Sequence, residues 1–262
     1  MFFLDKIRFG MNYLLSSFFV NILGLAKSTR KNLEQCKNKY KGKRCFIIGN
    51  GPSLTKEDLE KLKGEYTFAS NKIYKLFDKT SWRPDFYAIF DENVGKSEGT
   101  MENVDRLQCK FKFFRKQGFY VYKKIRAKYN VCYIKSFWSR KYLDNPQFSL
   151  DLKSGLYTIG TVTYAMIQIA VWMGFTEIYL LGVDNNYSVT IDRNNKIHVN
   201  ETVKDYAWEN KNVVPNPVWE QNVAFDYAEQ FSKTYGFKIY NATRGGKLES
   251  FERIDFDKIF ER

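Results

Sequence analysis

A glycine-rich turn directly after an apolar run is the feature of this sequence with the clearest chemical consequence. Phe46–Ile48 leads into Gly49-Asn50-Gly51-Pro52-Ser53, and a helix-like pattern follows. A first β-strand that ends in such a turn presents backbone N–H groups to a phosphate-bearing ligand. The turn lacks the Lys-Ser/Thr pair of a Walker loop and the third glycine of a dinucleotide fingerprint. It predicts phosphate binding, and a plain tight turn is the alternative.

Polar residues also follow several other predicted strands directly. The strands are expected at residues 44–48, 66–69, 85–90, 177–181 and 238–240, and the polar residues after them are Asn50, Asn71, Asp91, Asp184 and Asn241. Any one of these residues alone is typical of a helix cap or a turn. Because the carboxyl ends of parallel strands meet at one edge of a sheet, we expect the five side chains to line one ligand crevice.

The elements that would position these residues alternate between strand-like and helix-like segments. Helices are predicted at 55–62, 160–173 and 220–235, and shorter strands at 119–122 and 131–134. This alternation predicts an α/β, Rossmann-like fold with a mainly parallel sheet and helices on both faces. A polar stretch at 185–217 holds the only histidine, His198, and is expected to form a small lid insert.

Composition argues against metal chemistry. The chain has four cysteines without a Cys-x-x-Cys pair and one histidine, so a zinc site of usual spacing is not expected. This cysteine usage favours a reducing, cytosolic environment. The only Asp-x-Asp motif, Asp255-Phe256-Asp257, lies at a predicted helix start and is typical of capping. We therefore expect neither a metal nor a cofactor.

The net charge of +13 is concentrated in two segments. Residues 1–45 carry ten Lys or Arg against two Asp or Glu, and residues 104–145 carry twelve against two. Such a field indicates an anionic partner: a membrane surface, a nucleic acid or a phosphorylated substrate. Phe111–Lys116 interleaves aromatic and cationic residues, but no known nucleic-acid recognition module is present. We expect peripheral contact with an anionic membrane and no nucleic-acid partner; two solvated faces are the alternative.

The N-terminal segment fits this expectation. Apolar residues recur at helical spacing through residues 1–26, but polar residues interrupt them too often for a transmembrane helix. An amphipathic helix in the membrane interface, followed by a basic linker over 27–43, is expected. Residues 1–42 would then form one unit and residues 43–262 the catalytic domain. The alternative is a helix packed on the domain or on a second copy in a homo-oligomer.

Several blocks resemble known families. Ile47–Leu54 with Ser70-Asn71, and then Gly174–Asp184, resemble the bacterial family 42 sialyltransferases, which use CMP-sialic acid. A related group is closer, and contains the archaeal 6-hydroxymethylpterin diphosphokinase and motility-associated proteins that glycosylate flagellin. The blocks similar to that group are Gly160–Thr163, Gly182–Tyr187 and Asn241–Glu249. The resemblance covers roughly residues 43–260.

The resemblance implies a GT-A-like variant of the Rossmann fold and a set of site residues. Those implied in binding the donor nucleotide are Gly49, Asn50, Gly51, Pro52, Ser53, Asn71, Asp91, Gly160, Thr161, Thr163, Asn186 and Tyr187. Arg244 and Lys247 are candidates for contacts with the phosphate or the acceptor, and solvated turn residues are the alternative.

The identity of the catalytic base is left open. The sialyltransferases place a catalytic histidine just before the last large helix, where this chain has Trp219 and Glu220. His198 lies about twenty residues earlier, in the predicted insert. An imidazole and a carboxylate can both accept a proton from an acceptor hydroxyl. His198 acting from a lid, Asp184 and Glu220 are therefore the three candidates.

The function that this resemblance implies is a metal-independent glycosyltransferase at the cytoplasmic face of the membrane. It would move a nucleotide-activated sugar, such as a CMP-nonulosonic acid, to a glycan or lipid-linked acceptor. The product would be a bacterial surface glycan such as a capsule polysaccharide. The alternatives are a pterin diphosphokinase that uses ATP and Mg²⁺, and a non-catalytic nucleotide-binding protein at the membrane.

Overall fold

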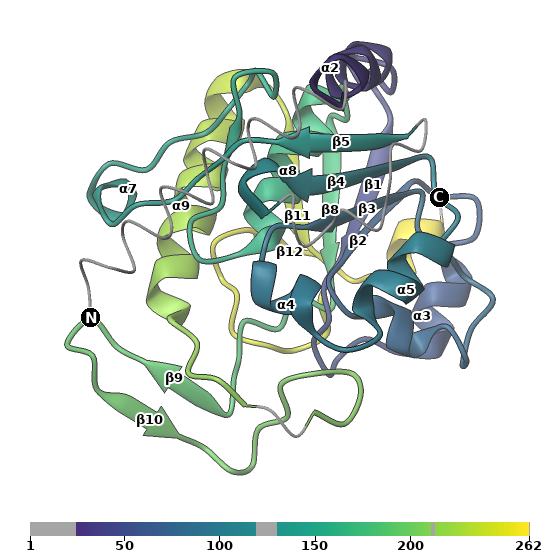
Figure 1. Cartoon of the computed structure of the whole chain (residues 1–262). Coiled ribbons are helices and arrows are strands. Elements are labelled where there is room, and N and C mark those ends of the chain that lie inside the picture. Colours follow the sequence, from purple (N-terminus) through teal and green to yellow (C-terminus); the bar gives the residue numbers. More distant parts are fainter. Residues whose placement is uncertain (1–24, 119–129, 211–212, 262) are drawn as a thin grey trace.

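The computed structural model describes residues 25–118, 130–210 and 213–261, and its centre is an eight-stranded sheet (Figure 1). Its strand order is β12-β11-β8-β1-β2-β3-β4-β5. The bounds are β1 Arg44–Ile48, β2 Thr67–Ser70, β3 Phe86–Ile89, β4 Phe111–Arg115, β5 Val131–Ile134, β8 Glu177–Leu181, β11 Lys238–Asn241 and β12 Glu252–Arg253. Every neighbouring pair is parallel. The α/β fold with a mainly parallel sheet is confirmed.

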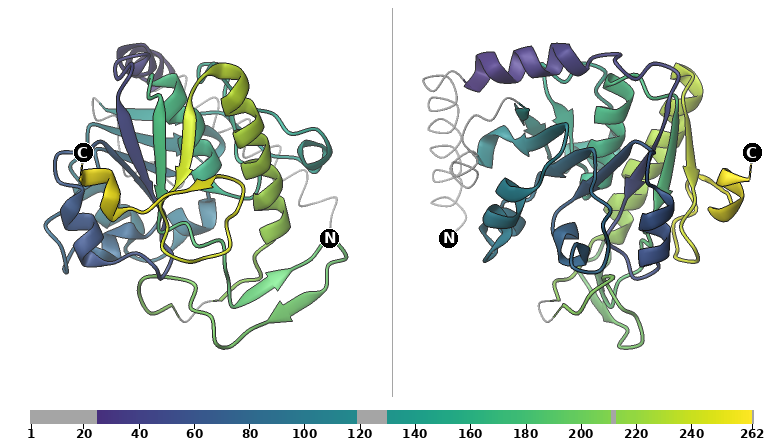
Figure 2. Two further views of the ribbon diagram at one scale, coloured as in Figure 1. Left: turned by 180° about the vertical axis from the view of Figure 1, so that it is seen from behind. Right: turned by 90° about the vertical axis from the view of Figure 1, so that its right-hand side faces the viewer.

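Helices cover both faces of this sheet (Figures 1 and 2). The α-helices are α2 Leu25–Cys36, α3 Lys56–Lys61, α4 Glu92–Lys96, α5 Thr100–Arg106, α7 Lys141–Asp144, α8 Val162–Trp172 and α9 Val218–Tyr235. Short 3₁₀ segments lie at Ile73–Leu76, Lys116–Gly118 and Asp257–Phe260. One apolar core lies between the sheet and α8 with α9, and the other lies between the sheet and α3 with α5.

Strand β1 is apolar from Cys45 to Ile48 because both of its faces are buried. In β1, Cys45 and Ile47 belong to the core on the α8 side, and Phe46 and Ile48 belong to the core on the α3 side. This is the expected pattern for a parallel sheet between two helical layers.

The chain order creates a switch point between β1 and β8. The chain first adds β2, β3, β4 and β5 on one side of β1, then returns through α8 and adds β8, β11 and β12 on the other side. Ligands of open parallel sheets bind outside the carboxyl ends of the strands at such a point. The turn after β1 and the residues after β8 meet there.

Helix α2 corrects the expectation of a linker over 27–43. Residues 25–36 form a helix whose buried side is Leu25, Thr29, Asn32, Leu33 and Cys36. Thr29 Oγ1 accepts a hydrogen bond of 3.0 Å from the Tyr133 N–H, and Asn32 Nδ2 donates one of 2.9 Å to the Val131 carbonyl. The helix thus covers the edge strand β5. The expected amphipathic helix over residues 1–26 lies almost entirely outside the described residues.

Strand β4 is a second difference from the sequence prediction. Phe111–Lys116 had the pattern of a basic, aromatic surface, but Phe111–Arg115 is an interior strand. Lys112 is buried, and its ammonium group donates to the Val104 carbonyl at 2.7 Å. Part of the basic segment 104–145 is therefore internal. The strand predicted at 119–122 lies outside the described residues.

Two smaller sheets flank the main one. Strands β9 (Val189–Ile191) and β10 (Ile197–Val199) form an antiparallel hairpin, and β6 (Ser136–Phe137) pairs in parallel with β7 (Leu156–Tyr157). The hairpin belongs to the predicted insert 185–217. Helix α2 and this hairpin lie at opposite ends of the molecule (Figures 1 and 2).

Candidate functional site

The five polar strand ends lie side by side in the sheet. Strands β11, β8, β1, β2 and β3 are consecutive neighbours, so the residues after them share one edge. Asn241 has a structural role at this edge, because its amide donates to the Leu248 carbonyl at 2.7 Å and accepts from the Thr243 N–H at 3.0 Å. We call the remaining four residues together with Asn185 the strand-end cluster: Asn50, Asn71, Asp91, Asp184 and Asn185.

The turn after β1 differs from the predicted phosphate-binding turn. The N–H groups of Gly49 and Gly51 donate to the carbonyls of Leu181 and Gly182 at 2.8 and 2.9 Å. The Ser53 N–H donates to Asp184 Oδ1 at 3.3 Å, and Pro52 has no N–H group. The backbone of Gly49–Ser53 therefore bonds mainly to the end of β8. A ligand here meets the Asn50 side chain rather than a row of free amides.

The two glycines of this turn are required by contact with the chain itself. A Cβ atom on Gly49 would overlap the Gly182 carbonyl oxygen. A Cβ atom on Gly51 would overlap Asp184 Oδ2 and lie 2.8 Å from the same carbonyl. The resemblance implied Gly51 in donor binding; the structure attributes this glycine to close approach of the β8 end.

Asp184 connects the ends of β1 and β8. Its Oδ2 accepts a hydrogen bond of 2.7 Å from Ser53 Oγ, and the side chain is almost entirely shielded from solvent. Burial raises the pKa of this carboxyl, and the bonds from Ser53 oppose that rise. Ser53 thus fixes the orientation of the carboxylate at the switch point.

Three amides of the strand-end cluster have a buried oxygen without a hydrogen-bond partner among the described residues: Asn50, Asn71 and Asn185. Their amide nitrogens or backbones are bound, since Asn50 Nδ2 donates to the Ser70 carbonyl at 3.4 Å and Asn185 Nδ2 to Asn222 Oδ1 at 2.6 Å. A buried acceptor without a donor costs about 1–3 kcal/mol. Three such oxygens at neighbouring strand ends are suited to accept hydrogen bonds from a ligand.

Backbone geometry helps to hold two of these amides. Asn71 and Asn185 have φ angles of 54° and 50°, in the left-handed region. The Tyr87 hydroxyl donates to the Asn71 carbonyl, which fixes the position of Asn71. Asparagine tolerates this conformation better than most residues do. The sequence analysis selected Asn186 rather than Asn185; only the structure shows that Asn185 has the unpartnered oxygen.

Part of the insert folds back over this edge. We call residues Asp205–Trp208 the cover segment. The Ala207 N–H donates to the Asn50 carbonyl at 2.9 Å, and Asp205 accepts bonds from Ser188 at 2.6 and 3.0 Å. Burial raises the pKa of Tyr206, and the nearby charges of Asp205 and Asp91 add to that rise. The cover segment thus lies between the end of β3 and the start of the insert.

The N-termini of α8 and α9 complete the edge. Thr161 caps α8 by accepting from the Thr163 N–H at 3.2 Å. Gly160 has a φ of 63°, and a Cβ atom there would lie 3.2 Å from Glu220 Cβ, so the start of α8 packs closely on the start of α9. The next residue of α9 is Gln221, whose Oε1 accepts from the Tyr187 hydroxyl at 3.3 Å. Burial raises the pKa of Tyr187 to about 12, so this hydroxyl remains a donor at neutral pH.

The three candidates for the base lie in different environments. Glu220 is half-buried, burial raises the pKa of its carboxyl, and the charge of Arg140 partly opposes that rise. Asp184 is buried and bound to Ser53. His198 lies on the exposed hairpin, where its Nε2 is 2.9 Å from Asp192 Oδ2. The described contacts of His198 do not connect it to the strand-end cluster.

The two predicted basic contacts also differ from each other. Arg244 is bound by Asp58 and by Asp257, the latter at 2.9 Å, and these bonds raise the pKa of its guanidinium. Lys247 is exposed, and its backbone N–H donates to the Asp184 carbonyl at 2.7 Å. Lys247 therefore lies beside the strand-end cluster, whereas Arg244 joins α3 to the C-terminal segment. Asp255 accepts from the Asp257 N–H at 3.0 Å, as expected for a cap.

Comparison with known proteins adds a family to this geometry. Residues 18–190 match the family described as 6-hydroxymethylpterin diphosphokinase MptE-like, which is more than half of the chain. The chain belongs to this MptE-like family. The matched span includes the strand-end cluster, while the cover segment and Glu220 lie beyond it. Among curated proteins, none matches the sequence significantly.

One solved structure shares this fold at low sequence identity, and a second superposes less closely. The MAf glycosyltransferase from Magnetospirillum magneticum AMB-1 superposes with a TM-score of 0.51 and 16% identity over 89% of this MptE-like chain. The chain spans only 39% of the MAf protein. The sialyltransferase CstII from Campylobacter jejuni, solved with cytidine-5′-monophosphate, gives a TM-score of 0.43 and 15% identity, over 80% of this chain and 84% of CstII.

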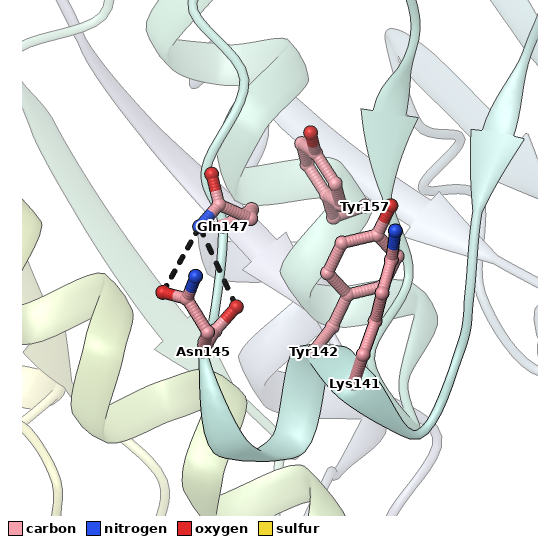
Figure 3. Close-up of a pocket in the computed structure, with 5 residues that line it drawn as sticks. All are labelled: Lys141, Tyr142, Asn145, Gln147 and Tyr157. Atoms are coloured by element: carbon pink, nitrogen blue, oxygen red, sulfur yellow. Dashed lines mark hydrogen bonds between the residues drawn. The ribbon is translucent and has the colours of Figure 1, made fainter.

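Two cavities lined by described residues lie outside the strand-end cluster. One, of about 350 Å³, is lined by Lys141, Tyr142, Asn145, Gln147 and Tyr157 (Figure 3). Its two tyrosine rings contact edge to face with centroids 5.0 Å apart. The other, of about 510 Å³, lies between α7, the hairpin and the start of α9, and includes Glu220.

Within the described residues, no three His, Cys, Asp or Glu side chains converge as metal ligands would. Over the same residues, no helix combines the length and the apolar character needed to span a bilayer.

Proposed function

We propose that this MptE-like chain is a glycosyltransferase that binds a nucleotide-activated sugar at the strand-end cluster. The observation that carries the proposal is the set of unpartnered buried oxygens on Asn50, Asn71 and Asn185. Nucleobase amino groups and ribose hydroxyls are donors that amide oxygens can accept. The position at the switch point of the sheet supports the same ligand class. The fold shared with the MAf glycosyltransferase is consistent with this chemistry.

The donor phosphate is assigned to the start of α8. The backbone N–H groups of the Gly49–Ser53 turn are mostly bound to protein, whereas the first turn of a helix has N–H groups without intrahelical acceptors. The adjoining start of α9 adds a second helix N-terminus, and both favour an anion. The Tyr187 hydroxyl and the Lys247 ammonium supply a hydrogen-bond donor and a charge for the leaving group.

We assign the general base to Glu220. Its carboxylate has no hydrogen bond or ion pair among the described residues, so it is free to accept a proton. Burial raises its pKa toward the range in which general bases operate. Asp184 is bound to Ser53 and acts as a positioning residue for the turn after β1. The resulting transfer joins the sugar to a hydroxyl of a glycan or lipid-linked acceptor.

A thermal-shift screen tests donor binding. The full chain is measured with CMP, UDP, GDP and ATP, each with Mg²⁺ or with EDTA. A nucleotide present at 100 times its Kd should raise the free energy of unfolding by about 2.7 kcal/mol. A shift that is equal in Mg²⁺ and EDTA supports metal-independent sugar transfer. The absence of a shift with every nucleotide would contradict the proposal.

The family description favours a second candidate, transfer of diphosphate from ATP to a hydroxymethylpterin. Diphosphate transfer from ATP ordinarily requires Mg²⁺ to neutralise the phosphate oxygens. In the same screen, this candidate predicts a shift only with ATP and only in the presence of Mg²⁺. A 6-hydroxymethylpterin-dependent release of AMP would then replace the first proposal with the second.

We further propose that the protein acts at the cytoplasmic membrane surface and contributes to a surface glycan. The outer side of α2 and the turn after it carry exposed cations: Lys27, Arg30, Lys31, Lys37, Lys39, Lys41 and Lys43. The acid on that side, Glu34, is paired with Lys153 at 2.5 Å. Such a surface attracts anionic lipid headgroups.

Vesicle binding tests this surface. Each lysine near an anionic membrane contributes about 1 kcal/mol, so Lys37, Lys39 and Lys41 all replaced by Gln should weaken binding roughly 100-fold. The control replaces three exposed lysines elsewhere, Lys56, Lys63 and Lys79. Vesicles of phosphatidylcholine with phosphatidylserine are compared with phosphatidylcholine alone. Equal losses in the two triple variants would contradict this docking surface.

A further inference from the structure

A cleft of about 510 Å³ lies next to the strand-end cluster and has its own set of polar groups. Arg140 precedes α7, Arg193 lies in the turn of the hairpin, and Trp219 and Glu220 begin α9. Asp144, at the end of α7, also lines it. A volume of this size accommodates a small ligand of one or two rings.

Two guanidinium groups, on Arg140 and Arg193, line this cleft. Within the described part of the chain, neither Arg140 nor Arg193 forms an ion pair. The Arg193 guanidinium instead lies 5.2 Å from the centre of the Trp219 ring, which holds it by a cation–π contact. Arg140 is close enough to Glu220 for its charge to act on that carboxyl. The two exposed guanidinium groups favour an anionic ligand, although the carboxylates of Asp144, Asp192 and Glu220 line the same cleft.

The cleft connects directly to the strand-end cluster through the first turns of α9. Glu220 lines the cleft and packs on Gly160 at the start of α8. The next residue, Gln221, accepts from the Tyr187 hydroxyl, and Asp184 acts electrostatically on Tyr187. A molecule in the cleft would therefore lie next to Glu220, at the start of the helix that also contacts Tyr187.

We propose that this cleft binds an anionic sugar residue of the acceptor, with Arg140 and Arg193 on its carboxylate or phosphate group. Asp144 would accept hydrogen bonds from its ring hydroxyls, and Glu220 would face the hydroxyl that reacts. The identification of this ligand as the acceptor rests on the proposed glycosyltransferase function. The site itself, an anionic-saccharide cleft between α7, the hairpin and α9, is independent of nucleotide binding.

Three small probes test the anion preference without any nucleotide. Methyl glucuronide and methyl glucoside differ only in a carboxylate, and glucose 6-phosphate carries a phosphate in its place. Binding to the full chain is measured by ligand-observed NMR titration. Charge-assisted hydrogen bonds should make one of the anionic probes bind at least about tenfold tighter than the glucoside. A preference for the glucuronide identifies a carboxylate as the anion, and a preference for glucose 6-phosphate identifies a phosphate.

Matched variants locate the binding. Replacing Arg140 and Arg193 with Gln should remove the preference for the anionic probe. Lys196→Gln removes a positive charge from the same hairpin outside the cleft and should leave the preference unchanged. Equal affinity for glucuronide, glucose 6-phosphate and glucoside, or an unchanged preference in the double variant, overturns the inference. Nucleotide shifts measured on the same double variant separate the two proposals, because neither arginine belongs to the proposed nucleotide contacts.

Discussion

The strand-end cluster and the hairpin β9/β10 place titratable groups in opposite environments. Asp184 is about 8% exposed and bound to the turn after β1, and burial raises its pKa. His198 is a side chain about 51% exposed on a two-stranded ribbon, beside Asp192. The first region is part of the sheet, and the second is held by few contacts. Asp184 and His198 thus differ in exposure because one lies at the end of a sheet strand and the other on the hairpin. Their residue types do not account for the difference.

This difference shows why the only histidine of a chain is a weak guide to its chemistry. An imidazole in solvent needs no special surroundings, so its presence in a polar hairpin carries little information. A buried carboxylate or an unpartnered buried amide lowers the stability of the fold, and retaining it requires another reason. Glu220, Asn71 and Asn185 are of this second kind.

The largest expected effect compares the two regions by activity. Glu220→Gln should lower turnover by about 10²–10⁴-fold, because a base is lost while the shape is kept. His198→Gln should change turnover less than about threefold, since an exposed pair contributes little. Steady-state kinetics with the donor found by the thermal-shift screen measures both. The reverse result, a large loss only in His198→Gln, would move the base to the hairpin.

A smaller effect concerns the contact between the ends of β1 and β8. Gly51→Ala should lower the free energy of unfolding by about 1–3 kcal/mol, because the new Cβ overlaps Asp184 Oδ2. Asp184→Ala removes that atom, so the double variant should lose less than the two single losses together. Urea unfolding of the four proteins gives the coupling. Strictly additive losses would refute the contact as the reason for glycine.

The smallest expected effect is a pH dependence of stability. Burial raises the Glu220 pKa above its ordinary value of 4.5, so the folded chain retains this proton at a pH where the unfolded chain releases it. The free energy of unfolding therefore falls as the pH rises from 4.5 through the folded pKa, and the loss is complete above it. Glu220→Gln should be more stable than the original at pH 7, with no difference below pH 4.5.

An exposed glutamate provides the control for this pH effect. Glu201 lies in the insert and is exposed, so Glu201→Gln should leave the difference between pH 7 and acidic pH unchanged. Thermal unfolding across the pH range compares the three proteins. A stability gain in Glu220→Gln that persists unchanged below pH 4.5 would show that burial of the charge is not its cause.

The sequence predicted the parts of the fold that depend on local pattern. Apolar runs ending in polar residues located β1, β2, β3, β8 and β11, and their parallel order followed from alternation with helices. The helix predicted at 55–62 is α3, and Thr55 and Asp58 form a capping box at its start with both bonds at 3.1 Å.

Strand β4 and helix α2 were not predicted, because polar residues occupy some of their buried positions. In β4, the charged residue Lys112 interrupts the apolar pattern that would have indicated a buried strand. Its ammonium group bonds a backbone carbonyl inside the protein while its methylene groups pack among apolar residues. In α2 the buried positions include Thr29 and Asn32, which pair with β5. The spacing of Leu25, Thr29, Leu33 and Cys36 was available in the sequence as evidence for a helix.

Only those site residues that lie at the ends of predicted strands could be predicted from the sequence. Asn50, Asn71, Asp91 and Asp184 follow from the sheet, because each stands shortly after the last residue of a strand. The cover segment depends on a long insert folding back to Asn50, and no local pattern encodes that contact. The free oxygen of Asn185 likewise depends on which of its neighbours supply donors.

The central claim is that the unpartnered amide oxygens bind a nucleotide, and one calorimetric comparison tests it most directly. Asn71→Gly removes such an oxygen, and glycine can keep the backbone φ of 54°. The control is Asn38→Gly, which removes the amide of an exposed asparagine with the same φ, remote from the site. The ligand is the nucleotide with the largest thermal shift. We expect about tenfold weaker nucleotide binding for Asn71→Gly and no change for Asn38→Gly. Equal affinity of the original chain and both variants would contradict it.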